Sequence, residues 1–499
     1  MLTLTTSKRY LLAMLSGAVS FFAYPSPGIW PAIFISVLGL YLSVRGLTFW
    51  RAFGVGFVGG AAYYVAQIYW ISQYLGPRPL VGLAAVEALI FAVGAAFMAL
   101  ATKRLQRTWQ LALVVAILWN SREWVATHFP YGGFPWSRVA MSQSNSPLAF
   151  WVAVGGFGLL TFVIVFVTIF TFERMTRKTP RGLQTVAAFI GIAFIVPIGI
   201  GALPITSSGS LKIAAVQGNA NAGLFSNVDR GTILENHLDA TDTLLASQEE
   251  FDLVVWPENA SDKNPDDFPD AEALLRDLVD NKLKKPLIFG TITSSGEEFF
   301  NSSKLYLPGR GEVDQYDKKR PVPFGEYVPD REFFYQIAPD LIGMISRGYS
   351  FGTRDGIFEV SGVKTGILIC FEEAIDEVPR EVVEQGATVI IAQTNNADFG
   401  KSDESVQQLG IGRLRAIETG RAIVHISTVG PSAIIGPKGE LIETTEAYVP
   451  DYLNAEVPLV SGKNLAMSGG WLFDPVSAVL GGLIALILII DNRRKTTKL

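Results

Sequence analysis

The sequence predicts a multi-span α-helical membrane domain joined to a large layered α/β domain, and three observations lead to that fold class. First, 49% of the 499 residues are hydrophobic and only 17% are charged, whereas soluble domains carry about 25% charged residues. Second, long apolar windows fill the first two fifths of the chain and its C-terminal end. Third, the stretch between them has an ordinary charge content, and short β-branched runs alternate there with helical patterns.

Eight apolar windows are candidates for membrane helices, since about 20 residues cross the hydrocarbon core of a bilayer. They cover residues 10–25, 28–47, 53–70, 81–101, 109–124, 148–171, 183–204 and 471–490. The first window follows Lys8 and Arg9 as in a signal peptide, but no small-residue cleavage pattern follows it. We therefore expect an uncleaved first helix, a membrane domain of about seven helices over 1–209, an α/β domain over 210–465, and a C-terminal membrane helix with a basic tail over 466–499.

The basic residues in the short connections predict the orientation, because Lys and Arg accumulate in cytoplasmic loops. The chain ends and alternate connections hold 15 of them, and the other connections hold three, Arg78, Arg122 and Arg138. The 15 are Lys8, Arg9, Arg45, Arg51, Lys103, Arg104, Arg107, Arg174, Arg177, Lys178, Arg181, Arg493, Arg494, Lys495 and Lys498. With eight spans, both termini are expected in the cytoplasm and residues 210–465 on the opposite side of the membrane.

The middle stretch is long enough for one large α/β core. Strands are expected at Leu211–Val216, Leu253–Trp256, Leu287–Ile292, Lys304–Leu307, Thr365–Ile369, Thr388–Ala392, Ala422–Ser427 and Ala433–Ile435. Helices are expected at about 229–248, 269–283 and 404–420, and Ser207–Ser210 is expected to be a short linker. Strands that alternate with helices predict a layered fold with a largely buried sheet.

Three segments each place a reactive side chain just after an expected strand, where α/β folds usually assemble their sites. Glu258 ends the run Val254–Glu258, Lys318 follows Tyr316 and Asp317, and Cys370 follows Gly366–Ile369. A thiol is mostly protonated at neutral pH, so a carboxylate must take its proton as the sulfur attacks a carbonyl, and a fixed ammonium can stabilise the oxyanion that forms. Glu326 would keep Lys318 charged and oriented. Taken singly, each of these residues more often has an ordinary structural role, since a lone cysteine after an apolar strand is usually a small buried hydrophobe and a Glu or Lys in a loop is usually solvated.

Other classes of site have little support in the sequence. The single cysteine excludes a disulfide scaffold, and the net charge of -5 shows no basic excess for nucleic acid. The three histidines lack metal-ligand spacing, and no nucleotide-binding glycine motif is present, so neither a metal nor a cofactor is expected.

Several motifs in order resemble those of the nitrilase superfamily, whose Glu-Lys-Cys triad sits on an αββα sandwich. They are Trp256-Pro257-Glu258, Tyr316-x-Lys318 with Val322–Glu326, and Cys370-Phe371-Glu372. Spacing and flanking residues resemble most closely the apolipoprotein N-acyltransferases, the membrane-bound branch of that superfamily, and the resemblance extends over nearly the whole chain. It includes Val216–Asn219, Gly133–Trp136 and the pattern Arg415-Ala416-x-Glu418-x-x-Arg421.

The resemblance implies a role for each matched residue. Cys370 becomes the nucleophile and acyl carrier, Glu258 the general base and Lys318 the oxyanion stabiliser, with Glu326 and Glu372 as supporting carboxylates. Trp136 resembles an aromatic at the mouth of a lipid-binding region, although an interfacial tryptophan is an equal interpretation. The chain departs from the family pattern at Asp398, beside Phe399, where a tryptophan is usual, and after Asn219, where Phe225 is the nearest aromatic. Those departures concern substrate contacts and leave the triad intact.

The resemblance implies a ping-pong transfer of a fatty acyl chain from a membrane phospholipid to the α-amine of a diacylglyceryl-modified apolipoprotein cysteine. It places the protein, expected to be a monomer, in the bacterial cytoplasmic (inner) membrane. Two other functions stay open: a membrane-anchored nitrilase-like amidase that hydrolyses a small C–N substrate, and a non-catalytic lipoprotein-binding scaffold. An amidase would use water as its second nucleophile and need no lipid, and a scaffold would have no physical reason to keep all four of Glu258, Lys318, Glu326 and Cys370.

Overall fold

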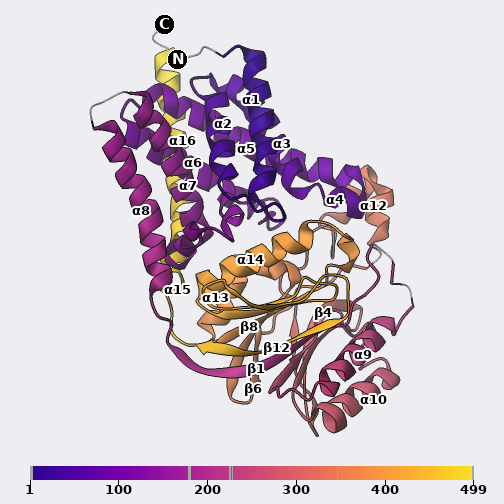
Figure 1. Cartoon of the computed structure of the whole chain (residues 1–499). Coiled ribbons are helices and arrows are strands. Elements are labelled where there is room, and N and C mark those ends of the chain that lie inside the picture. Colours follow the sequence, from indigo (N-terminus) through magenta and orange to yellow (C-terminus); the bar gives the residue numbers. More distant parts are fainter. Residues whose placement is uncertain (1–3, 178–180, 224–225, 228, 346, 497–499) are drawn as a thin grey trace. The chain divides into compact units, whose positions relative to one another are not determined.

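The computed structural model describes residues 4–177, 181–223, 226–227, 229–345 and 347–496 (Figure 1). The chain divides into two compact units. One unit, here called the helical unit, comprises Met1–Leu203 and Ser468–Leu499. The other, here called the sandwich unit, comprises Pro204–Met467.

The helical unit consists of α-helices joined by short connections and 3-10 turns. Its α-helices are α1 (Thr6–Val19), α2 (Ala32–Val44), α3 (Phe49–Ile68), α4 (Ile71–Leu75), α5 (Pro77–Arg104), α6 (Thr108–Ala126), α7 (Val152–Thr176), α8 (Gly182–Ala202) and α16 (Phe473–Thr496). Glycines bring three of them close together, because a Cβ on Gly60 of α3 would lie 2.8 Å from the Cβ of Phe91 on α5. On the other face of α3, a Cβ on Gly17 of α1 would lie 2.4 Å from the Gly59 carbonyl oxygen. Small residues at such crossings let helix backbones approach in a membrane.

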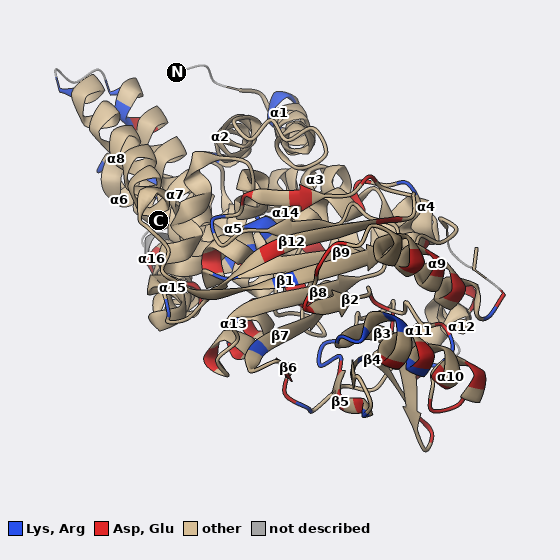
Figure 2. Cartoon of the chain, turned by 60° about the horizontal axis from the view of Figure 1, so that its bottom comes forward, with Lys and Arg blue, Asp and Glu red and all other residues tan. Residues whose placement is uncertain are grey.

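Four helical segments among the described residues are long and apolar enough to cross a membrane by length and composition: Pro77–Arg104, Pro147–Thr176, Gly182–Ala202 and Gly470–Asn492. Each of the eight apolar windows contains a helix, but α1 and α2 have only 14 and 13 residues, too few to cross a bilayer as single straight helices. The expected number of about eight spans is therefore not confirmed. Figure 2 shows few charged residues along α2 and α7, and many on the helices α9 (Thr232–Ala246) and α10 (Pro269–Asp277) of the sandwich unit.

The sandwich unit holds two six-stranded sheets. The first has the order β12-β1-β2-β3-β4-β5, with β1 (Ser207–Gln217), β2 (Leu253–Val255), β3 (Leu287–Ser295), β4 (Glu298–Leu307), β5 (Gly311–Asp317) and β12 (Asp451–Val460). The second has the order β11-β10-β9-β8-β7-β6, with β6 (Ile357–Val360), β7 (Val363–Ile369), β8 (Val389–Thr394), β9 (Ala422–Ser427), β10 (Ala433–Ile435) and β11 (Leu441–Thr444). β1, β2 and β3 pair in parallel, as do β7, β8 and β9.

Three buried clusters show that the layers follow the order helix, sheet, sheet, helix. One cluster joins the inner faces of both sheets, including Ile213, Val255, Ile367 and Val424. A second packs the first sheet against α9 (Thr232–Ala246) and α10 (Pro269–Asp277), which continues into the π-helical turn Leu278–Leu283. A third packs the second sheet against α13 (Glu377–Glu384), α14 (Glu404–Thr419) and α15 (Leu465–Ser468). This nitrilase-like sandwich is the α/β fold expected from the sequence.

The segment Ser207–Ser210, expected to be a linker, instead begins strand β1 and pairs with β12. The serine side chains support this pairing, because the hydroxyls of Ser207 and Ser208 both donate to the Leu459 carbonyl oxygen, at 3.0 and 3.2 Å. Strands β5, β6, β11 and β12 were not expected, since their exposed or edge positions carry polar residues in place of β-branched runs. The short helices α11 (Arg331–Ile337) and α12 (Pro339–Met344) are further additions.

Candidate active site

The three residues of the expected triad lie directly after three strands of the sandwich unit. Glu258 follows β2, Lys318 follows β5, and Cys370 follows β7 at the first position of the 3-10 turn Cys370–Ala374. Carboxyl ends of strands are where α/β sheets gather functional side chains, because the strands stop there and the loops expose them. The structure places all three residues in one buried cluster.

Lys318 and Glu258 form a close buried pair. The Lys318 Nζ lies 3.7 Å from Glu258 Oε1 and 2.9 Å from the Glu326 carboxylate, and Lys318 and Glu258 are almost fully buried. Asn301 of β4 donates from its Nδ2 to Glu258 Oε1 at 2.6 Å and to Glu326 Oε1 at 2.9 Å. The Val322 backbone N–H donates to Glu326 Oε2 at 2.6 Å. Glu326 therefore forms an ion pair with Lys318, and Asn301, which sequence reasoning missed, ties the two carboxylates together.

Burial and neighbouring charges set the protonation of this cluster. Burial raises the pKa of Glu258 to about 7, and Glu326 adds to the rise, while Lys318, Asn301 and a hydrogen bond with the Cys370 thiol work against it. Burial alone would lower the pKa of Lys318, but Glu326 and Glu258 raise it on balance, so this ammonium stays charged. Burial and the Glu258 charge raise the pKa of Cys370 well above its usual value. The resting site therefore holds a neutral thiol beside a carboxyl group that titrates near neutral pH.

Cys370 lies on a tight turn. The backbone φ of Cys370 is 53°, in the left-handed region that non-glycine residues rarely adopt. Observed strain of this kind is common at functional sites, where the surrounding structure holds it in place. The Gln408 Nε2 on α14 lies 3.8 Å from the Cys370 Sγ, within reach of a hydrogen bond to sulfur. The turn thus aims the thiol toward Glu258 on one side and Gln408 on the other.

Glu372 supports this turn through its backbone contacts. Its Oε2 accepts from the Ile369 N–H at 2.9 Å, and its Oε1 accepts from the Lys319 and Arg320 N–H groups at 2.7 and 3.1 Å. The Tyr316 hydroxyl donates to the same carboxylate at 2.9 Å. Glu372 is fully buried and joins the end of β7 to the segment that follows β5. It therefore holds the Cys370 and Lys318 segments together.

A second set of buried polar side chains extends from Gln408, and the sequence reasoning did not find it. Asn396 donates from its Nδ2 to Gln408 Oε1 at 2.8 Å and to Glu404 Oε2 at 2.7 Å. Asn396, Glu404 and Gln408 are each at most 3% exposed. The only sequence signal for this set is the polar, charged start of an otherwise buried helix, Glu404–Thr419.

The expected substrate-binding residues have separate surroundings. Asp398 is exposed and Phe399 is half-buried, and both lie on a 3-10 turn (Ala397–Phe399). Burial is the main cause of the raised pKa of the Tyr349 phenol, and the charges of Glu326, Glu258 and Asp398 add to the rise. Trp136 lies in the helical unit, where it is 6% exposed and contacts Phe134 and Trp70. Phe225 lies outside the described residues.

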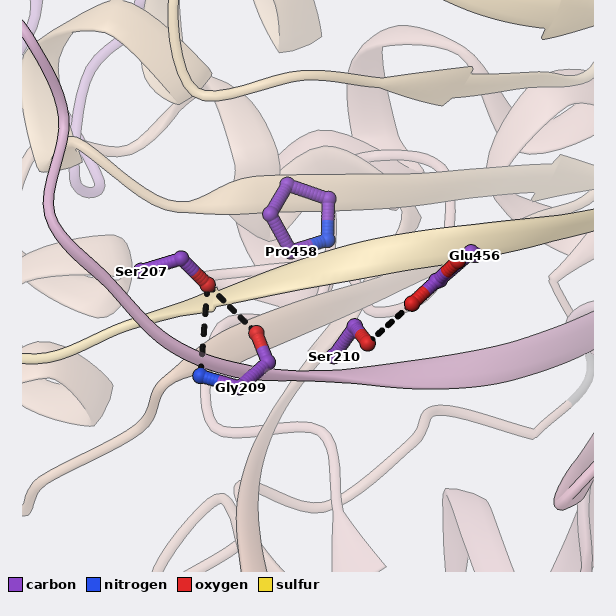
Figure 3. Close-up of a pocket in the computed structure, with 5 residues that line it drawn as sticks. All are labelled: Ser207, Gly209, Ser210, Glu456 and Pro458. Carbon is purple, nitrogen blue, oxygen red and sulfur yellow. Dashed lines mark hydrogen bonds between the residues drawn. The ribbon is translucent and has the colours of Figure 1, made fainter.

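No site for a metal is apparent in the described parts of the chain, which hold no group of three or more His, Cys, Asp or Glu side chains placed to bind one. A shallow surface hollow is lined by Ser207, Gly209, Ser210, Glu456 and Pro458, on strands β1 and β12 (Figure 3). A hydrogen bond from the Ser210 hydroxyl to Glu456 crosses between the two strands there. None of the triad residues lines this hollow, so we assign the chemistry to the buried cluster.

Comparison with known proteins matches both units to described families. The model of the apolipoprotein N-acyltransferase N-terminal domain matches residues 16–170, and the carbon-nitrogen hydrolase model matches residues 212–466. The protein named apolipoprotein N-acyltransferase from Mycolicibacterium smegmatis is 32% identical to this chain, over 96% of this chain and 84% of that protein. The protein of the same name from Geobacter metallireducens is 27% identical, over 98% of this chain and 96% of that protein.

Among solved structures, an amidase from Nesterenkonia sp. is similar to this chain with a TM-score of 0.39 and 17% sequence identity, covering 54% of this chain and 95% of that chain. A nitrilase-superfamily protein from Saccharomyces cerevisiae has a TM-score of 0.39 and 18% identity, covering 50% of this chain and 91% of that chain.

Proposed function

The chain belongs to the apolipoprotein N-acyltransferase family, and we propose that its buried Glu258–Lys318–Cys370 cluster transfers a fatty acyl chain to apolipoproteins through a thioester. The observation that carries the proposal is the cluster itself: an ammonium 3.7 Å from a carboxyl group that is hydrogen-bonded to the single cysteine. A nucleophile, a base and an oxyanion stabiliser are what acyl transfer requires. The family name identifies the acceptor as an apolipoprotein.

In the first half-reaction, the Cys370 sulfur attacks the carbonyl carbon of a phospholipid ester while Glu258 takes the thiol proton. Because burial keeps the thiol neutral at rest, this proton must leave as the sulfur–carbon bond forms. Lys318 stabilises the oxyanion, since its charge is held by Glu326 in a site that excludes water. The ester C–O bond then breaks, Glu258 returns the proton to the departing oxygen, and lysophospholipid leaves a thioester on Cys370.

In the second half-reaction, the α-amine of the diacylglyceryl-modified cysteine attacks the thioester carbon. The new C–N bond forms, the C–S bond breaks, and Glu258 passes one amine proton to the departing sulfur. The same oxyanion contact serves both halves, because both pass through a tetrahedral centre at the same carbon. The product is an N-acylated lipoprotein and the free Cys370 thiol.

The apolar helices of the helical unit fit a protein of the bacterial cytoplasmic (inner) membrane, where both lipid substrates reside. We place the sandwich unit on the extracytoplasmic side and both termini in the cytoplasm, from the distribution of Lys and Arg in the connections. We further propose that the enzyme acts as a monomer, that Asp398 and Phe399 contact the substrates near Tyr349, and that Trp136 contacts lipid in the helical unit.

Intact-protein mass spectrometry tests the proposal. Detergent-purified full-length protein and its Cys370→Ala variant are incubated with phospholipid, and a diacylated lipopeptide is then added. The expected result is a fatty-acyl mass increment on the wild type alone, which disappears as the lipopeptide gains the same mass.

Three outcomes would overturn the proposal. An increment of equal size on Cys370→Ala would show that the acyl group is attached to a residue other than Cys370. Loss of the increment to water at the same rate with and without lipopeptide would favour the amidase, since an amidase uses water as its second nucleophile. Absence of any increment in the wild type would exclude the thioester intermediate and therefore the ping-pong reaction.

A further inference from the structure

Beyond the triad and Glu326, a further carboxyl group acts electrostatically on the Cys370 thiol. Glu404, at the start of α14, contributes to the raised pKa of Cys370, and Glu258 in turn contributes to that of Glu404. A continuous set of hydrogen bonds joins it to the sulfur: Glu404 to Asn396 at 2.7 Å, Asn396 to Gln408 at 2.8 Å, and Gln408 to Cys370 at 3.8 Å. Glu404 and Gln408 are four residues apart, so one face of α14 presents both.

The proton balance of the second half-reaction requires a group that the triad does not supply. An α-amine is largely protonated at neutral pH, so the acceptor arrives as an ammonium with three N–H bonds. The amide product keeps one of them, so two protons leave the nitrogen. Glu258 delivers one to the Cys370 sulfur, while Lys318 stays charged throughout and cannot accept the other. A second acceptor near the thioester is therefore needed.

We propose that Glu404 is this second acceptor: it binds the α-ammonium group of the apolipoprotein and takes one of its two protons when the amine attacks the thioester. The proposal rests on the acyl transfer proposed above. In this step the N–C bond forms and the S–C bond breaks. One proton moves from the nitrogen through Glu258 to the Cys370 sulfur, and the other moves from the nitrogen to Glu404. When the product leaves, Glu404 releases its proton to water.

The surroundings of Glu404 suit this exchange. Burial raises its pKa to about 8, with Glu258 and Glu373 adding to the rise and the hydrogen bond from Asn396 opposing it. At pH 7 a carboxyl group with this pKa is mostly protonated, so Glu404 becomes the acceptor once the positive α-ammonium group binds beside it, because an opposite charge favours the carboxylate and the carboxyl proton leaves to water. An α-amino group titrates at about 7.7–8.0, so a proton then moves between the two groups at modest free-energy cost. The other neighbours are the uncharged Asn396 and Tyr448, whose own pKa rises through burial and the Glu404 charge. The Lys401 ammonium lies over the Tyr448 ring, 5.2 Å from its centre.

The two half-reactions differ in their need for a second proton acceptor. The phospholipid ester brings no ammonium group to be deprotonated, so acylation of Cys370 has no need of Glu404. Only discharge to a protonated amine does. Glu404→Gln keeps the size of the side chain and its ability to accept from Asn396, while it removes the charge and the proton-accepting oxygen.

The experiment forms the acyl-enzyme from phospholipid on full-length protein and then follows its discharge by mass spectrometry. For Glu404→Gln we expect acylation no slower than in the wild type, because loss of the Glu404 charge eases ionisation of the Cys370 thiol. We expect discharge to a diacylated lipopeptide to be slower by about 100-fold at pH 7, a typical value for one proton-transfer group. The deficit should shrink as the pH rises above 8, because the amine then arrives unprotonated. Discharge to hydroxylamine, which is neutral at pH 7, should match the wild type.

A charge-matched control is Glu384→Gln on α13, whose partly exposed carboxylate pairs with Arg380 of its own helix. It should discharge like the wild type at every pH. The proposal is overturned if Glu404→Gln discharges to lipopeptide at the wild-type rate at pH 7, or if acylation and hydroxylamine discharge fall by the same factor, because the role would then be structural. Absence of acyl-enzyme in the wild type would refute the thioester itself and so the proposed function.

If Glu404→Gln fails to fold, Glu404→Asp tests the proposal instead. Aspartate keeps the carboxylate, but its side chain is shorter by one methylene group, so the carboxylate lies farther from the amine. Slower lipopeptide discharge at pH 7 with normal hydroxylamine discharge supports the proposal, and equal loss of both overturns it.

Discussion

Replacing Arg415 should destabilise the sandwich unit and misplace the nucleophile. This arginine of α14 is fully buried, and its guanidinium binds the turn that carries Cys370. Its Nε donates to the Glu373 carbonyl oxygen at 2.8 Å, and one terminal nitrogen donates to the Ala374 carbonyl oxygen at 2.8 Å. The guanidinium also pairs with Asp376 at 2.6 Å and Glu418 at 2.5 Å. The side chain thus ties the turn after Cys370 to the helix behind it.

The magnitude follows from what Arg415→Met leaves behind. Methionine fills similar space. However, Glu418, whose side chain is only 8% exposed, loses its ion pair with Arg415, and the carbonyl oxygens of Glu373 and Ala374 lose their arginine donors. Removing one partner of a buried ion pair costs about 3–5 kcal/mol. For a unit of this size each kcal/mol shifts the melting temperature by roughly 2–4 °C, so we expect a fall of roughly 6–20 °C.

The assay is thermal unfolding of the detergent-purified full-length protein, followed by tryptophan fluorescence, with acyl-enzyme formation measured in parallel. Arg413→Met is the matched control, because Arg413 lies on the same helix, is partly exposed, and donates from its Nε to the Gly439 carbonyl oxygen. Arg413→Met should lower the free energy of unfolding by about 1 kcal/mol, the usual value for one hydrogen bond. If Arg415→Met cost no more than Arg413→Met, the reasoning that the guanidinium anchors the turn would be refuted.

Two further predictions concern the catalytic cluster. The rate of Cys370 acylation should rise with pH through about 7, because Glu258 must be ionised to accept the thiol proton and burial raises its pKa to that value. Asn301→Leu removes the hydrogen bond that lowers this pKa, so the midpoint of the pH–rate profile should move to higher pH, and an unchanged midpoint would contradict the assignment of Glu258 as the base. Gly290→Ala should slow acylation by about 100-fold, because its Cβ would lie 2.6 Å from the Glu258 Cα and must displace the base. Gly343→Ala, where nothing lies within 4 Å of the added Cβ, is its control, and equal rates for the two variants would show that the position of Glu258 is not critical.

The strands of the central core were predictable because their residues are apolar on both faces. The strands at Ala422–Ser427 and Ala433–Ile435 have the same bounds in the structure as expected from the sequence. Layers of helix cover both sheets, so these runs are continuous and β-branched, which is the strongest local signal a strand can give. The polar edge strands β5 and β11 lack that signal, and only pairing with a neighbour makes them strands.

The number of membrane spans expected from the apolar windows is not confirmed by the helices that those windows form. Composition shows that a segment is apolar, but the length of the helix it forms depends on where the chain turns. The helices α1 and α2 end after 14 and 13 residues, whereas α5 continues for 28. A window of about 20 apolar residues therefore does not by itself make a helix of that length.

The sequence by itself determined the family, the layered α/β fold and the identity of the three residues after β2, β5 and β7, because these rest on residue types and their order. Only the tertiary structure decided which other side chains meet them. Asn301, Glu404 and Gln408 come from two further elements, β4 and α14, and each has an ordinary polar neighbourhood in the sequence. Their roles depend on contacts between residues that lie 38 to 43 positions apart, as in Gln408 with Cys370 and Asn301 with Glu258. Such contacts exist only once the strands of the first sheet have paired and α14 has packed on the second sheet.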